Sequence, residues 1–267
     1  MQSLLGRTGR RGLLPLAALV GCTASPVQWT AERTVTATGT AVTLTADGAV
    51  RVDGLASLQA RMTPPSAFCA ASLRLSRSGS RLYAVWWSPR ADSTATLASA
   101  FTSDEGTTWN AVVPVDTLDR GRTGCGRAPA AISADAASGY VHVAYAMLAA
   151  EGPGIFYAHS MDGGATFHAP VPIVYGDRLG STSVAATGDR VVVAYEDPNS
   201  RTARIGLALS RTMGHIFEDR VLPVSDDNGA ATQPLVAVQQ HHITIAWQER
   251  ATRNGGTILR LRSGTLP

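Results

Sequence analysis

The sequence predicts an all-β protein, and within that class a β-propeller built from four-stranded antiparallel blades. Three observations carry this prediction. A short apolar segment that ends in Ala and an aromatic residue recurs four times, with the aromatic residue at positions 86, 145, 195 and 247. Gly and Pro, which punctuate turns, number 26 and 14 among the 267 residues. Only 16% of the residues are charged, which disfavours long solvent-facing helices.

The recurring segment has the pattern of a buried strand, because it is apolar or alternating over about five residues. Its spacing of about 50 residues matches the length of one propeller blade. We expect it to form the second strand of each blade. The four copies are Leu82–Trp86, Val141–Tyr145, Val191–Tyr195 and Ile243–Trp247.

Further strand patterns flank each copy. The expected first strands are Ala71–Leu75, Ala130–Ser133, Ser183–Ala186 and Leu235–Val238. The expected third strands are Thr94–Phe101, Gly154–His159, Arg204–Leu209 and Thr257–Leu261. The expected fourth strands of the first three units are Asn110–Val115, Ala169–Val174 and Asp219–Val224.

The fourth unit ends too close to residue 267 for a fourth strand of its own. Propellers commonly close their ring with a strand from the N-terminal side of the domain. Thr34–Leu55 offers short stretches of alternating Thr and Val that suit strands. These stretches would either complete the fourth blade or build a partial fifth, so four or five blades are expected.

The turn between the third and fourth strands carries a motif of the form [S/T]-x-D-x-G-x-T-[W/F] in the first two units. Its Asp can accept hydrogen bonds across a tight turn, its Gly can adopt a positive φ, and its aromatic residue can fill space between sheets. The third unit has Thr212 in place of the Asp. The motif residues are Thr102, Asp104, Gly106 and Trp109 in the first unit, and Ser160, Asp162, Gly164 and Phe167 in the second.

These turns resemble the Asp box, or BNR repeat, of the sialidase superfamily, and the resemblance covers roughly residues 69–263. It implies a propeller in which the Asp boxes are structural turns and the ligand site lies at the opposite face, at the mouth of the ring. Loops between second and third strands, and loops leading into first strands, would form that face. The residues expected there are Trp87, Arg90, Arg127, Gln233, Gln248 and Glu249.

Sialidases hold the substrate carboxylate with three Arg and use a Tyr nucleophile, a Glu and an Asp acid/base. Arg127 stands at the start of a strand where one such Arg could lie, and Glu196 and Asp197 form a carboxylate pair beside a loop. These three are the catalytic candidates. Each also has a structural interpretation: Arg127 as a rim residue, and Glu196 with Asp197 as a solvated turn. Ser183 and Gln233, rather than Arg, occupy the positions equivalent to Arg127.

Residues 1–21 have the pattern of a secretory signal, with three Arg followed by the short apolar run Gly12–Val20. The run leads into Leu19–Cys22, which resembles the bacterial lipobox and implies lipid attachment at Cys22. An ordinary signal peptide with an incidental Cys22 is the alternative. We expect a lipoprotein signal peptide over 1–21, a tether over 22–33 and one propeller domain over 34–267. The expected location is extracytoplasmic, with the lipid anchored in a bacterial membrane.

Cys69 and Cys125 each precede the first strand of a unit, and the two units are adjacent. The propeller would therefore place them on neighbouring blades, within bridging distance. Because an exported protein meets an oxidising environment, we expect a disulfide, with two buried free thiols as the alternative.

All 23 basic residues are Arg, and three of them lie in the predicted signal peptide. The other 20 balance the 20 acidic residues, so a nucleic-acid partner is not expected. The six His show no metal-ligand spacing, and no phosphate-binding Gly loop is present. The sequence therefore predicts neither a metal site nor a cofactor.

Three functions follow as hypotheses. The first is a lipid-anchored binding module that presents the mouth of the propeller to a glycan or a protein at the cell envelope. The alternative is an exo-acting glycoside hydrolase of sialidase type, and the third is an assembly factor for an envelope complex. Three Arg converging at the mouth, opposite a Tyr–Glu pair, would favour the hydrolase.

Overall fold

The computed structural model describes residues 25–35, 42–44, 50–52, 62–222, 224–225, 229–250 and 257–266. The predicted signal peptide and Cys22 lie outside these ranges. Within them, no helix is long and apolar enough to cross a membrane.

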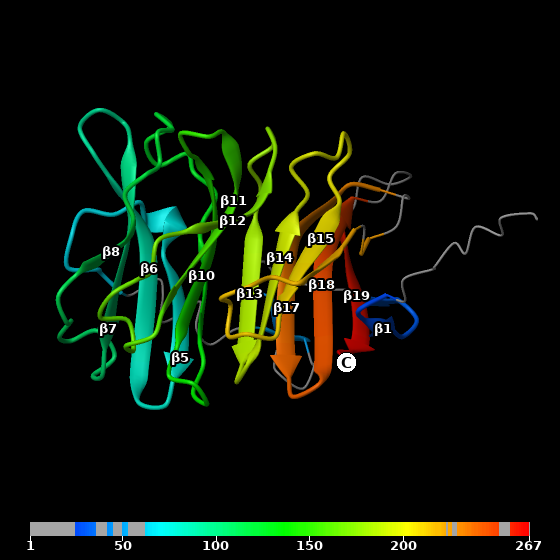
Figure 1. Cartoon of the computed structure of the whole chain (residues 1–267). Coiled ribbons are helices and arrows are strands. Elements are labelled where there is room, and N and C mark those ends of the chain that lie inside the picture. Colours follow the sequence, from blue (N-terminus) through cyan, green and yellow to red (C-terminus); the bar gives the residue numbers. More distant parts are fainter. Residues whose placement is uncertain are drawn as a thin grey trace, which may run out of the picture.

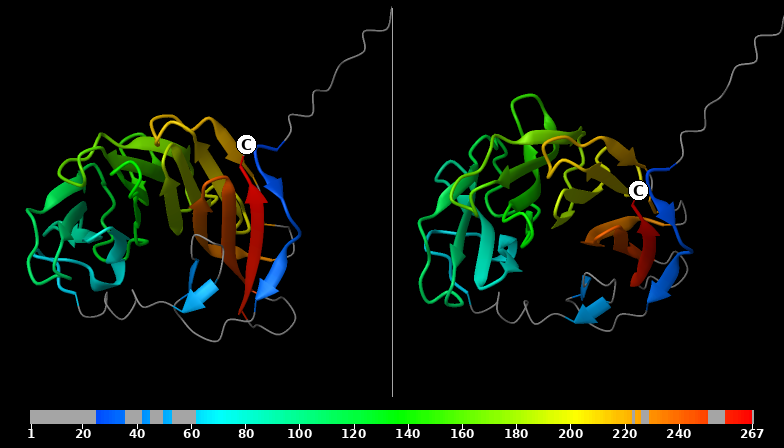
Figure 2. Two further views of the ribbon diagram at one scale, coloured as in Figure 1. Left: turned by 90° about the horizontal axis from the view of Figure 1, so that it is seen from below. Right: turned by 60° about the horizontal axis from the view of Figure 1, so that its bottom comes forward.

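Four antiparallel sheets stand side by side in chain order (Figure 1) and curve around a common centre (Figure 2). The predicted all-β propeller architecture is confirmed, with one copy of the recurring segment in each sheet. Blade 1 contains β5 (Arg74–Ser78), β6 (Arg81–Pro89), β7 (Ala95–Thr102) and β8 (Val113–Asp116). Blade 2 contains β9 (Ala131–Ala134), β10 (Val141–Leu148), β11 (Pro153–Ser160) and β12 (Val171–Tyr175). Blade 3 contains β13 (Thr182–Thr187), β14 (Arg190–Glu196), β15 (Ile205–Ser210) and β16 (Asp219–Val221).

Blade 4 contains β17 (Ala231–Gln239), β18 (His242–Arg250) and β19 (Thr257–Thr265). Two N-terminal strands, β1 (Gln28–Trp29) and β2 (Arg33–Val35), pair with β19 and complete this blade. The closing strands therefore begin within the range expected to be a tether.

A separate hairpin follows, formed by β3 (Val42–Leu44) and β4 (Val50–Val52). Leu44 packs against Leu259 and Leu261 of blade 4, so the hairpin stands beside that blade as a small fifth sheet. The two alternatives for the segment Thr34–Leu55 are therefore both found. Its first residues pair with blade 4, and its later residues form a fifth, two-stranded sheet. In blade 1, residues Ala70–Ser72 form a 3₁₀ turn, so the first strand starts later than expected.

Three of the four recurring aromatic residues, Tyr145, Tyr195 and Trp247, fill the spaces between neighbouring sheets. Tyr145 of blade 2 packs edge-on against Trp87 of blade 1, with ring centroids 6.1 Å apart. Tyr195 of blade 3 lies in the apolar cluster shared with blade 2, and Trp247 of blade 4 in the cluster shared with blade 3. These three side chains are fully buried, as is Trp86, the recurring aromatic residue of blade 1, and each contributes on the order of 2 kcal/mol to folding. Because the repeat returns the aromatic residue to the same face of each blade, one sequence pattern supplies all three interfaces.

The two turns with the Asp motif are built alike. In the β7–β8 turn, Thr102 Oγ1 donates to Asp104 Oδ1 at 2.6 Å, and Thr108 donates to the carboxylate from its backbone N at 2.8 Å and its hydroxyl at 2.6 Å. Ser160 and Thr166 donate to Asp162 in the same way in the β11–β12 turn. These hydrogen bonds to the ionised carboxylates lower the pKa of both Asp104 and Asp162 to about 2.

The third turn keeps this geometry with Thr212 in place of the Asp. The backbone N of Ile216 donates to Thr212 Oγ1 at 2.9 Å, as a backbone N donates to the carboxylate in the other turns. Gly214 has a φ of 85°, beside 89° and 87° at the equivalent glycines. A Cβ on Gly214 would lie 1.9 Å from Tyr157 Oη of blade 2, so glycine is required for the close approach of the two blades.

The double variant D104N/D162N tests the contribution of these carboxylates. A carboxylate whose pKa is depressed in the folded state stabilises that state above the unfolded pKa of about 3.9, and loses this contribution as the pH falls through 2. We expect the variant to be less stable than wild type at pH 7 and to lose less stability between pH 4 and pH 2, as measured by urea unfolding. Asp177→Asn, at an exposed acid outside the turns, is the control. An unchanged pH dependence in the double variant would contradict the assignment.

Candidate functional site

A cavity of about 520 Å³ lies at the centre of the ring, where the first strands of blades 1 to 4 approach one another. Gln233 and Gln248, both expected at the ligand face, line this cavity. Among the described residues that line it, Arg74 is the only charged one. Hydroxyl groups are also present along one side, on Ser181, Thr182 and Ser183.

Gln233 has an unusual backbone conformation, with a φ of 52° in the left-handed region that disfavours residues other than glycine. The register between β17 and β18 shifts between Thr232 and Leu235, so Gln233 lies within a β-bulge. Glu196 Oε1 on blade 3 accepts a hydrogen bond from the backbone N of Gln233 at 2.9 Å. The neighbouring blade thus stabilises the bulge at which Gln233 lines the cavity.

The carboxylate pair proposed for catalysis is engaged in structural hydrogen bonds. Glu196 holds the bulge, and Asp197 accepts hydrogen bonds from the backbone N of Asn199, at 3.2 Å, and from the hydroxyl of Ser200. Neither residue lines the central cavity. The structural interpretation of this pair is the one that the hydrogen bonds support.

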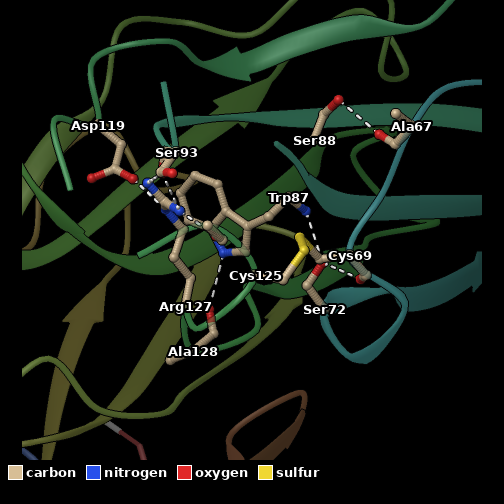
Figure 3. Close-up of a disulfide and its surroundings, with 11 residues drawn as sticks. Ala67, Cys69, Ser72, Trp87, Ser88, Ser93, Asp119, Cys125, Arg127 and Ala128 are labelled. Atoms are coloured by element: carbon tan, nitrogen blue, oxygen red, sulfur yellow. Dashed lines mark hydrogen bonds and ion pairs between the residues drawn. A yellow bond between two sulfur atoms is a disulfide. The ribbon is translucent and has the colours of Figure 1, made fainter. Parts of the chain in front are cut away.

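Arg127 lies at the β8–β9 connection, as expected, but its guanidinium is buried and points toward Asp119 (Figure 3). Arg127 Nε and Asp119 Oδ2 are 2.5 Å apart, and the two side chains are only 6% and 2% exposed. The remaining guanidinium nitrogens donate to the carbonyls of Gly121 and Gly124. Arg127 is therefore fully occupied in holding its own loop.

Trp87 lies in the interior and not at the ligand face. Successive side chains of a strand point to opposite faces, and blade 1 is buried on both, so Trp86 and Trp87 are both core residues. Trp87 Nε1 donates to the carbonyl of Ala128 at 3.0 Å, and the Arg127 guanidinium lies 5.5 Å from the Trp87 ring centroid (Figure 3). The Trp87 side chain thus packs against the β8–β9 connection and stabilises it.

The predicted disulfide between Cys69 and Cys125 is confirmed, with the two Cα atoms 5.3 Å apart. It joins the β8–β9 connection to the segment that precedes β5. In Figure 3 it lies next to Trp87 and on the same loop as Arg127. Covalent and ionic links therefore hold the same loop.

The other two residues expected at the ligand face lie away from the central cavity. Arg90 is exposed on the β6–β7 loop and donates to Thr96 Oγ1 at 2.6 Å. Glu249 is 5% exposed and forms an ion pair with Arg260 at 3.2 Å. Arg260 also reaches Glu32 at 3.2 Å, so this network fastens the closing N-terminal segment to blade 4.

The groups that a sialidase needs do not converge among the described residues of the cavity. These residues include one Arg and no Tyr, Glu or Asp. Tyr145 donates to Asp116 Oδ2 at 2.5 Å inside the blade 1–blade 2 interface. Burial raises the pKa of Tyr195, in the next interface, to about 12.

Four of the six histidines, which the sequence left unassigned, gather at the blade 2–blade 3 interface. His159 stacks on His168 with ring centroids 4.8 Å apart and meets His215 edge-on at 4.7 Å. His142 Nδ1 and Tyr157 Oη are 2.6 Å apart. Burial lowers the pKa of His142 to about 3 and that of His159 to about 4, so both are neutral at pH 7. Within the described ranges, no three such side chains are arranged to hold a metal ion.

No protein-family model matches the chain, and neither does any curated protein. Among solved structures, a protein of unknown function from Dyadobacter fermentans is similar over 70% of this chain and 50% of its own length. The two share 16% sequence identity, with a TM-score of 0.52. This similarity concerns the fold alone.

Two sialidase structures align less closely. A Hadza microbial sialidase has 17% identity and a TM-score of 0.49, over 71% of this chain and 43% of its own. A leech intramolecular trans-sialidase has 15% identity and a TM-score of 0.47, over 72% of this chain and 30% of its own. The chain thus spans half or less of the length of these three structures.

Replacing Arg127 by Ala tests the buried ion pair. Asp119 would then be left buried without its partner, which typically costs about 3–5 kcal/mol. We expect a loss of this size in the free energy of unfolding, measured by urea denaturation. Arg77→Ala is the matched control, because it breaks an exposed ion pair with Glu105 and should cost less than about 1 kcal/mol. Equal losses in the two variants would contradict the role assigned to Arg127.

Proposed function

We propose that the chain is a propeller-type binding module that takes a hydroxyl-rich saccharide in its central cavity. The observation that carries this proposal is the bulge at Gln233. Residues held in unfavourable backbone conformations cluster at functional sites. Gln233 is such a residue, and its backbone N donates a hydrogen bond to Glu196 of the neighbouring blade. The bulge places a side-chain amide at the cavity, where no hydrogen bond to a described residue satisfies it.

The chemistry of the cavity supports a saccharide as the occupant. The Gln233 and Gln248 amides each offer two donors and an acceptor, which suits neighbouring hydroxyls on a sugar ring. Arg74, whose Nη1 donates to the carbonyls of Ala71 and Leu73, adds one positive charge to the lining of the cavity. A volume of about 520 Å³ lies within the range of small-molecule sites.

We further propose that the protein works at the cell envelope, exported by its leader and anchored by a lipid on Cys22. The leader pattern and the disulfide support this location, because disulfides persist in extracytoplasmic compartments. A glycan or glycosylated protein of the envelope is the corresponding partner. Mass spectrometry of the exported chain tests the lipid anchor directly. A diacylglyceryl group on Cys22 supports the anchor, and an unmodified N-terminus at or beyond Thr23 contradicts it.

Binding of the purified chain to an array of neutral oligosaccharides tests the central cavity. We expect Q233A/Q248A to weaken binding about tenfold or more, since two ligand hydrogen bonds are lost. Gln239→Ala is the matched control, because Gln239 is exposed at the far end of the same strand. Equal binding by Q233A/Q248A and wild type would contradict the proposal. Release of monosaccharide from bound glycans would replace it with the glycoside hydrolase alternative.

A further inference from the structure

A second hollow, of about 840 Å³, opens away from the central cavity, between blades 1 and 2. Its walls come from the β6–β7 loop, the β8–β9 connection, the β10–β11 loop and the outer strand β12. The Asp-motif turns lie at one end of the sheets, and this hollow lies at the other end. Because the strands are antiparallel, the β6–β7 loop, the β8–β9 connection and the β10–β11 loop all emerge at that other end. The hollow shares no lining residue with the central cavity.

The β8–β9 connection that forms one wall is a long loop without regular structure, yet it is bonded to both neighbouring blades. The buried pair of Asp119 and Arg127 closes its middle, and the disulfide at Cys125 holds its far part. The backbone N of Arg120 donates to the carbonyl of Leu148 on blade 2 at 2.8 Å. The backbone N of Gly124 donates to the carbonyl of Ser93 on blade 1 at 3.0 Å. Long ordered loops of this kind are usually functional, and rigid ones lower the entropy cost of binding.

This loop presents two exposed positive charges, on Arg120 and Arg122. Both side chains line the groove and form no hydrogen bond or ion pair with any described residue. Arg90, on the facing loop, also lines the groove but bonds Thr96. Of the acidic residues along the groove, Asp119 is neutralised by Arg127, whereas Asp92 keeps its charge. Hydrogen bonds from Thr94, and then the positive charge of Arg122, lower the pKa of Asp92. With the Asp119–Arg127 pair set aside, Arg90, Arg120 and Arg122 stand against two acids, Asp92 and Glu151, so the lining of the groove has a small excess of positive charge.

The opposite wall is apolar and carries an exposed aromatic ring. Tyr175 is 43% exposed and rests edge-on against Phe156, with ring centroids 5.8 Å apart. Pro172 of β12 and Pro170, just before this strand, also line the groove. Because Pro lacks a backbone N–H, this edge is a poor template for an added peptide strand. Recognition by side chains, with a ring stacked on Tyr175, fits this wall better.

We propose that this groove is a second binding site, for an acidic saccharide bearing carboxylate or sulfate groups. Arg120 and Arg122 would hold the anionic group through their guanidinium forks, and Tyr175 would stack against the apolar face of a sugar ring. The fixed loop sets the separation between these two elements in advance. The site stands independently of the central cavity and of its proposed ligand.

Isothermal titration of the full chain with a sulfated heparin tetrasaccharide and with a tetragalacturonate tests the groove. We expect binding of at least one of them, weakening with added salt, and a loss of about tenfold or more in R120A/R122A and in Tyr175→Ala. Arg201→Ala is the matched control, since Arg201 is an exposed Arg on the β14–β15 loop of blade 3 and does not line the groove. It should bind as wild type does. Thermal unfolding of each variant should match wild type, because all of these side chains are on the surface.

Three results would overturn the proposal. The first is that neither oligosaccharide binds. The second is that R120A/R122A binds as tightly as wild type. The third is that poly-glutamate binds as tightly as the saccharides and Tyr175→Ala has no effect, which would assign the groove to an acidic protein segment. The variant Q233A/Q248A leaves the groove intact. Its effect on neutral-saccharide binding therefore tests the central cavity alone and says nothing about the groove.

Discussion

A buried ion pair between Asp119 and Arg127 is the constraint on which the loop face of the first two blades depends. Removing two charges from water is costly, and the cost is offset only when every polar atom finds a partner. Here Asp119 Oδ1 accepts from the backbone N of Gly121, at 3.0 Å, and from that of Leu148, at 3.1 Å. Arg127 donates to Asp119 and to two loop carbonyls. The pair thus defines the path of a loop that would otherwise have many conformations.

The two ends of this loop reach the two hollows of the molecule. Its early part carries Arg120 and Arg122 along the outer groove, and its end, at Pro129 and Ala130, lines the central cavity. The shape of each hollow therefore depends on the same buried interaction. The disulfide at Cys125 and the ring of Trp87 support it from the side that faces blade 1.

Much of the fold could be predicted from the sequence, because the propeller repeats one local pattern. The aromatic residue that ends each recurring segment returns at blade spacing, and Tyr145, Tyr195 and Trp247 each fill the interface with the preceding blade. The Cys69–Cys125 disulfide was predictable for the same reason, since the repeat places the two cysteines at equivalent positions.

The site residues were harder to predict, because their positions depend on contacts between loops. Asp119 belongs to no motif, so nothing in the sequence showed that it would neutralise Arg127. Trp87 follows a strand residue that is itself buried, and only burial of blade 1 on both faces explains why it too is interior. Part of the histidine cluster follows from the predicted hairpin of β10 and β11, because its register places His142 directly opposite His159.

Hydrogen exchange of the backbone amides in the β8–β9 connection tests the central claim most directly. If the buried pair holds this loop as described, the amides of Arg120, Gly121 and Gly124 will exchange as slowly as those of β6 and β10, because each donates to a fixed acceptor. Exchange of these three amides at the rate of an unstructured peptide, while the strands stay protected, would contradict the account.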